Sequence, residues 1–154
     1  MTLSEAQGLL SRFRRTPWRF QQTFHTPLNS LPAFVSAVVS AHGVVQGATV
    51  TIEQVVFEPK NLNALLAKHS LVCVDFQRWS VTADGEREVA ELLKATLGDW
   101  LDFLFVPTPK PFAIYADHDE YTTFLANTKS HLNRVVHALS AGGFKEVKDY
   151  EREL

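Results

Sequence analysis

Hydrophobic residues recur along the chain with two different periods, and each period predicts one kind of element. Apolar residues spaced three and four positions apart indicate a helix. Four segments show this spacing: 3–14, 62–66, 85–97 and 128–141. The stripes consist of Ala6, Leu9, Leu10 and Phe13; Leu62, Leu65 and Leu66; Val89, Leu92, Leu93 and Leu97; and Leu132, Val135, Val136 and Leu139. Segment 34–41 fits a second helix, but its valines also suit a buried strand.

Segments rich in Val, Thr, Ile and aromatic residues predict strands between these helices. They are Ala48–Phe57, Leu71–Val81, Phe112–Ala116 and Tyr121–Ala126, and Phe144–Tyr150 is a last strand or an extended tail. Trp100–Val106 has two interpretations, because Trp100, Leu101 and Leu104 continue the helical period past Gly98. We favour a helix that continues to about Leu104, and a strand over Trp100–Val106 is the alternative.

This order of elements predicts an α+β fold. The expected architecture is a mainly antiparallel sheet of about 4–5 strands with helices packed on one face. A length of 154 residues fits a single domain. Within it, we expect residues 1–46 to form a helical, charge-poor N-terminal element that packs on a sheet-and-helix core made by residues 47–154.

The most specific local pattern is a hairpin whose tip is acidic. The segments Phe112–Ala116 and Tyr121–Ala126 flank a polar tetrapeptide, Asp117–Glu120, which predicts two strands joined by a four-residue loop. Such a loop pairs Ala116 with Tyr121, Ile114 with Thr123, and Phe112 with Leu125. Both faces of the hairpin are then largely apolar, so we expect it to lie inside the sheet or to cover a partner.

The hairpin tip is the first candidate site. Its residues are Asp117, His118, Asp119 and Glu120, flanked by Tyr115 and Tyr121. In the interpretation we favour, the aspartates close the turn through side-chain hydrogen bonds. A divalent cation is a second interpretation, which needs further ligands such as His131, or His69 and Asp75. Acid/base catalysis is a third, with Asp117 or Glu120 as the base and His118 carrying the proton. No paired metal-ligand spacing occurs, so we expect no metal and no cofactor.

The second candidate site is a basic and aromatic stretch near the N-terminus. It contains Arg12, Arg14, Arg15, Trp18 and Arg19, and four arginines against Glu5 give the first 52 residues a local charge of +3. Arginines and aromatic rings suit phosphate contacts and base stacking. They also suit a helix end at the rim of a core. Because the rest of the chain is acidic, we do not expect nucleic-acid binding, and a match with the acidic tip, within the chain or between subunits, is at least as good an explanation.

Composition narrows the class of protein. The net charge is −2, and 21% of the residues are charged, as in ordinary globular proteins. Cys73 is the only cysteine, so no internal disulfide is expected, and its apolar neighbours predict a packed thiol in a cytoplasmic protein. No secretion signal is apparent at the N-terminus. The charge-free segment 20–52 is interrupted by Pro32, Gly43 and other residues, so we expect no membrane span.

The chain carries no nucleophile elbow, P-loop, dinucleotide-binding turn or paired-cysteine motif. We therefore expect a non-catalytic binding or protein-interaction module, of a regulatory or immunity-like kind, that contacts a protein partner or self-associates as a homodimer. The alternative is a small-ligand-binding protein or a metal-assisted acid/base enzyme that uses the Asp117–Glu120 tip.

Overall fold

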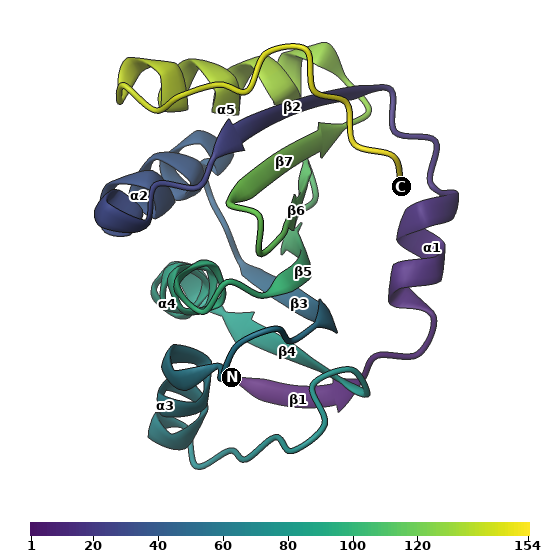
Figure 1. Ribbon diagram of the computed structural model, residues 1–154, viewed down its shortest axis with the longest axis vertical. Coiled ribbons are helices and arrows are strands. Elements are labelled where there is room, and N and C mark those ends of the chain that lie inside the picture. Colours follow the sequence, from purple (N-terminus) through teal and green to yellow (C-terminus); the bar gives the residue numbers. More distant parts are fainter.

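Seven strands form one continuous antiparallel sheet in a computed structural model that describes all of residues 1–154 (Figure 1). The strands are β1 (Thr2–Glu5), β2 (Phe20–His25), β3 (Gly47–Gln54), β4 (Trp79–Asp84), β5 (Asp102–Thr108), β6 (Ala113–Ala116) and β7 (Tyr121–Ala126). Their order across the sheet is β1-β4-β3-β5-β6-β7-β2. The two strands nearest the N-terminus therefore form the two opposite edges.

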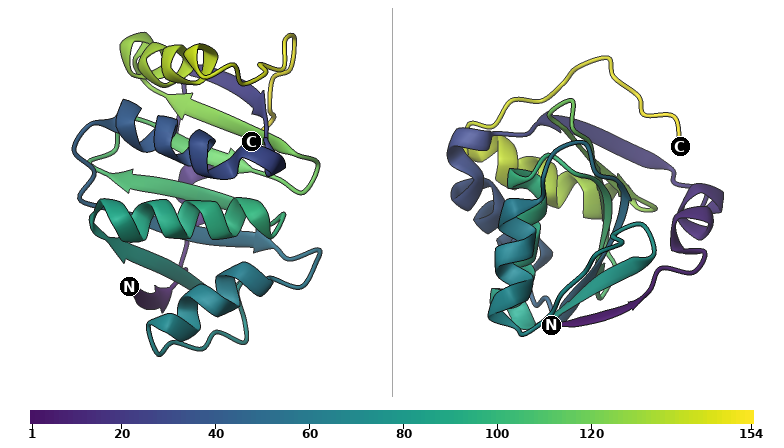
Figure 2. Two further views of the ribbon diagram at one scale, coloured as in Figure 1. Left: turned by 90° about the vertical axis from the view of Figure 1, so that its left-hand side faces the viewer. Right: turned by 60° about the horizontal axis from the view of Figure 1, so that its bottom comes forward.

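Four of the five α-helices cover one face of the sheet, and they lie side by side across it (Figure 2). These helices are α2 (Leu31–His42), preceded by a short 3-10 turn at Leu28–Ser30, α3 (Lys60–Lys68), α4 (Gly85–Gly98) and α5 (Lys129–Ala141). The remaining helix, α1 (Leu9–Arg15), lies against the opposite face, which we call the α1 face (Figure 1). None of the helices combines the length and the apolar character needed to cross a bilayer.

The main core fills the layer between the sheet and the four helices. It contains 33 buried residues, and its aromatic centre is Phe124 of β7. The Phe124 ring lies 6.1 Å from Phe24, 6.3 Å from Phe34 and 5.9 Å from Phe112, so it joins two strands, α2 and the segment before β6. Burying one such ring contributes roughly 1.5–3 kcal/mol.

A second, smaller core lies on the α1 face. Phe13 of α1 is buried there against Leu104, Ala113 and Leu125, which come from three adjacent strands. Because α1 covers this part of the sheet, central strand β5 is buried on both faces. That double burial explains why its sequence is a continuous apolar run and not an alternating one.

The α+β class and the antiparallel sheet are confirmed, but the predicted number of strands is too low. The sheet has seven strands because residues 1–46, which we expected to be helical, supply β1 and β2 as well as α1 and α2. The expectation of helices on one face also fails for α1. Edge strand β1 has four residues, mostly exposed, and β2 begins with exposed Phe20 followed by two glutamines, so neither shows a clear apolar period.

Two further predictions are wrong in the middle of the chain. The strand expected over Leu71–Val81 begins only at Trp79, and Val72 and Val74 lie in a loop with 82% and 94% of their surface exposed. The helix favoured up to Leu104 ends at Gly98, and the alternative strand is the correct one. Trp100 adopts a positive φ of 56°, a conformation that interrupts the helical path before β5 begins.

The predicted hairpin is confirmed, but its pairing is displaced by one residue. Ala116 pairs with Thr122 and Ile114 with Phe124. The backbone N–H of Asp117 donates to the carbonyl of Tyr121, 3.1 Å away, so the loop has three residues, His118 to Glu120. Glu120 has a φ of 66°, as expected for the last position of a three-residue hairpin loop. The shift places Tyr115 and Thr123 on the α1 face.

Candidate functional site

Asp117 anchors the hairpin tip to the rest of the molecule. Its Oδ1 accepts the backbone N–H groups of Asp119 and Tyr121, each at 3.1 Å. Its Oδ2 pairs with the guanidinium of Arg152, in the tail that follows α5. The first pair of bonds is the turn-closing role that the sequence predicts. The ion pair was not predicted, and it joins the tip to the C-terminal tail.

His118 is held by a carboxylate from the neighbouring strand. Its Nδ1 and its backbone N–H both lie 2.8 Å from Oδ1 of Asp102, a buried residue at the start of β5. This hydrogen bond raises the pKa of His118 above its ordinary value. Nε2, on the other side of the ring, lies 3.9 Å from the carboxylate of Asp119. An imidazole oriented in this way can take up a proton near neutral pH.

The two tyrosines beside the tip are also engaged within the molecule. The Tyr115 hydroxyl donates to the carboxylate of Glu53, which also pairs with Arg14 of α1. Burial, together with the charge of Asp102, raises the pKa of Tyr115. The Arg152 guanidinium lies 4.6 Å from the centre of the Tyr115 ring. Tyr121 packs edge to face on Tyr150 of the tail, at 4.9 Å.

Within the chain, the basic stretch does not meet the hairpin tip. Arg14 pairs with Glu53, and the cation that meets the tip is Arg152. Only Asp119 and Glu120 of the tip are exposed. The proposed additional metal ligands lie elsewhere, since His69 is next to Glu88 and His131 lies in the first turn of α5. No three His, Cys, Asp or Glu side chains are arranged to hold a metal ion. Cys73, which was predicted to be a packed thiol, is buried, and burial raises the pKa of its thiol.

Three of the remaining residues of the basic stretch, namely Arg12, Trp18 and Arg19, border two cavities. Trp18 packs 5.5 Å from Phe13 and donates its indole N–H to the Phe13 carbonyl at 3.2 Å. Arg12, Arg15 and Arg19 are exposed and form no ion pair with a carboxylate. Arg12 lies beside a cavity under α1, and Arg19 lies in a larger groove.

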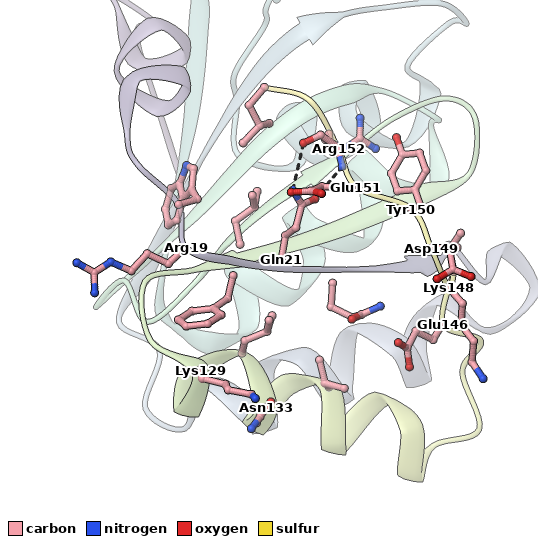
Figure 3. A pocket seen from close by; sticks show the side chains of 18 of the residues that line it. Arg19, Gln21, Lys129, Asn133, Glu146, Lys148, Asp149, Tyr150, Glu151 and Arg152 are labelled. Atoms are coloured by element: carbon pink, nitrogen blue, oxygen red, sulfur yellow. Dashed lines mark hydrogen bonds between the residues drawn. The ribbon is translucent and has the colours of Figure 1, made fainter.

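That groove, of about 1110 Å³, runs between β2, α5 and the C-terminal tail (Figure 3). Gln21 lies at its centre, with Arg19 and Lys129 toward one end and Lys148 and Asp149 toward the other. Apolar side chains contribute to the lining: Trp18, Phe20, Leu125, Leu132 and Val136. The groove is therefore large, mixed in polarity and bordered by an edge strand.

The tail pairs with only part of the outer edge of β2. His25 donates its N–H to the carbonyl of Lys145 at 2.9 Å, and Val147 donates to the carbonyl of Thr23 at 2.8 Å. Beyond Val147 the tail leaves the edge and returns at Arg152, whose backbone is bound by the side chain of Gln21. Backbone groups alternate in direction along a strand, so the N–H and C=O of Gln21 also point outward. No backbone group of the tail pairs with them.

The groove could not be found from the sequence, because β2 itself was not predicted. The only sequence signal for the groove was the interpretation of Phe144–Tyr150 as a strand or an extended tail. The segment is an extended tail, in which Glu146 forms a single bridge with Phe24. The chain matches no protein-family model, and no curated protein or solved structure is significantly similar to it.

Proposed function

We propose that the protein is a non-catalytic protein-interaction module that binds an extended segment of a partner along the open edge of β2. One observation carries the proposal: the outward N–H and C=O of Gln21 lie unpaired in a groove beside an edge strand. An extended peptide that adds to a sheet edge gains main-chain hydrogen bonds from such groups, and pockets alongside give specificity.

The native tail supports this mode of binding. Residues Lys145 to Val147 already form an antiparallel bridge to the same edge, so the edge accepts an added segment without rearrangement of the sheet. Because the Thr23 carbonyl already accepts the N–H of Val147, the open edge comprises residues 19–22. At about 3.3 Å per residue, these four positions correspond to roughly 13 Å of strand, which fits a partner segment of about four residues.

The charges of the groove favour an acidic partner. Five cations line it, namely Arg14, Arg19, Lys129, Lys148 and Arg152, against three carboxylates, Glu146, Asp149 and Glu151. Arg14 and Arg152 are already ion-paired, but Arg19 and Lys129 are not, and they lie at the same end. We therefore expect an acidic side chain in the partner to lie between Arg19 and Lys129.

Selection from a library of random heptapeptides displayed on phage tests the proposal. Selected peptides should be enriched in acidic residues, and calorimetry should show that Gln21→Pro weakens their binding at least about tenfold, because proline removes a main-chain donor. Proline is tolerated where an edge N–H points away from the sheet, so the variant should keep the sheet. Gln21→Ala removes the same side-chain bonds to Arg152 but keeps the N–H, so it should bind the peptides like the wild type.

A charge test uses Arg19→Glu with Lys129→Glu, and its matched control is Arg134→Glu on the exposed side of α5. The double variant should weaken binding of the acidic peptides, and the control should leave it unchanged. The proposal is refuted if the selected peptides bind all of these variants, and Gln21→Pro, as well as they bind the wild type. It is also refuted if the selection yields no binder.

A second copy of the chain is one partner that this edge fits. Two β2 strands that pair across a two-fold axis would join two sheets into one. Sedimentation of the wild type and of Gln21→Pro distinguishes the partners: a dimer lost in the variant assigns the edge to self-association, and a monomer in both assigns it to another protein. A cytoplasmic location belongs to the proposal, because Cys73 is a buried free thiol.

A further inference from the structure

A separate cavity of about 370 Å³ lies between α1 and the sheet. Phe13 and Trp18 border it from the α1 side, and Leu104 and Val106 of β5 border it from the sheet. These four side chains form an apolar wall. The volume falls within the range of small-molecule sites, which is roughly 300–1,000 Å³.

Hydroxyl groups line the part of the cavity next to β3 and β4. Thr49 and Thr82 lie opposite each other with their hydroxyls 3.2 Å apart, and the Thr51 hydroxyl lies 2.8 Å from that of Ser80. In such a pair one O–H donates to the other oxygen, so the second O–H stays free to donate to a ligand. The side chain of Thr108, also in the lining, makes no hydrogen bond within the protein.

Two cations lie at the rim, and no carboxylate lines the cavity. Arg12 makes one long hydrogen bond of 3.5 Å to the carbonyl of Gln7 and no ion pair. Lys110 has its Nζ 5.6 Å from the centre of the Trp18 ring and no carboxylate partner. Two positive charges without a counter-charge, next to free hydroxyl donors, provide a place for an anion.

We propose that this cavity binds a small organic carboxylate with an apolar body. The body packs between Phe13, Trp18 and Leu104, and the carboxylate meets Arg12, Lys110 and the threonine hydroxyls. At about 30 Å³ for each water-sized group, the cavity holds roughly twelve such groups, which corresponds to a bicyclic aromatic acid. The cavity is a different site from the groove along β2, although Thr16 and Trp18 border both, and each proposal has its own test.

Naphthalene-2-carboxylate, with its neutral amide as the matched compound, tests the proposal on the full chain in a buffer free of organic acids. Titration calorimetry should show one saturable site for the acid and at least about tenfold weaker binding of the amide, since a charged hydrogen-bond partner is lost. Amide resonances of Phe13, Thr49 and Leu104 should shift on titration with the acid.

The variant Arg12→Gln/Lys110→Gln should weaken binding of the acid about tenfold or more, and both side chains are exposed, so the fold should be retained. Arg15→Gln/Arg134→Gln removes the same charge elsewhere on the surface and should leave the affinity unchanged. The proposal is overturned if the acid and the amide bind equally well, or if the two double variants weaken binding equally. It is also overturned if the resonance shifts are confined to another region, or if no saturable binding is seen.

Discussion

Arg152 shows how one side chain can close a polar network across the α1 face. Its guanidinium pairs with Asp117, donates through Nε to the Thr123 hydroxyl at 3.0 Å and lies over the Tyr115 ring. Both members of the ion pair are largely shielded from water. Removing one partner from a shielded pair leaves an uncompensated charge, so the hairpin tip and the tail depend on each other.

At the same scale, His118 should make stability depend on pH. Its pKa is raised in the folded protein by the hydrogen bond to Asp102, so the protonated ring stabilises the fold. This contribution is complete below the unfolded pKa of about 6.5 and is lost as the pH rises through the folded value. Titration of the ring by NMR should give a pKa above 6.5, and Asp102→Asn should lower it.

Denaturation of wild type and His118→Gln at two pH values provides a second measurement. The difference in unfolding free energy should be larger at about pH 5.5 than at about pH 9. A difference that is the same at both values, or one that grows as the pH rises, would contradict the pairing.

The sequence identified the tip residues but not their partners, for a physical reason. Turn chemistry is local, so Asp117 could be read from its neighbours alone. Asp102 and Arg152 lie 16 and 35 residues from the tip residues they bind, and contacts at that distance depend on the fold. Asp102 was also assigned to a helix, which would have directed its side chain elsewhere.

At the scale of elements, α3 and α4 are joined by a buried carboxylate. Asp99, directly after α4, accepts the backbone N–H of Asn61 at 2.9 Å and that of Leu62 at 2.7 Å. These N–H groups belong to the first turn of α3 and have no partner within the helix. Asp99 therefore caps α3 from another element.

Asp99→Ala should therefore lower the unfolding free energy by about 2 kcal/mol, because two N–H groups of the first turn of α3, that of buried Leu62 among them, lose their acceptor. Chemical denaturation measures this change. The matched control is Asp119→Ala, an exposed carboxylate at the hairpin tip, for which we expect a change within about 0.5 kcal/mol. Similar losses in the two variants would show that Asp99 does not cap α3.

Helices with one buried stripe were predictable, and strands with two buried faces or none were not. The stripes of α4 and α5 matched a single period because one side of each helix meets the sheet. Strand β5 is covered on both faces, so its apolar run fitted either period. The valines of segment 71–78 alternate as they would in a strand, although they are exposed. An alternating pattern alone therefore does not show whether the apolar residues are buried.

At the scale of the whole molecule, the connection between α1 and β2 separates the two cavities. Thr16 and Trp18 line both the groove along β2 and the cavity under α1. A ligand that displaces Trp18 in one cavity alters the wall of the other. If the two occupants affect each other, linkage requires the effect on affinity to be equal in both directions.

We expect strands that pair with distant parts of the chain to fold later than strands that pair with near ones. The strand pairs with the smallest separation along the chain, such as β6 and β7, lie among β3 to β7. In contrast, β2 pairs with β7 across 100 residues, as the hydroxyl pair of Thr23 and Thr123 shows. Contacts between distant residues form late because loop closure costs entropy. Pulse-labelled hydrogen exchange during refolding should protect β6 and β7 before β1 and β2. Protection of β2 in the earliest phase would contradict this order.

The position of β1 and β2 at the edges has a consequence for synthesis on the ribosome. Both strands are made before the strands with which they pair, since β1 pairs with β4, which ends at Asp84, and β2 pairs with β7, which ends at Ala126. At about 5–20 residues per second, β2 waits roughly 5–20 s for β7 to be made. During that interval β2 has no strand with which to pair, so chaperones encounter it as an unpaired segment.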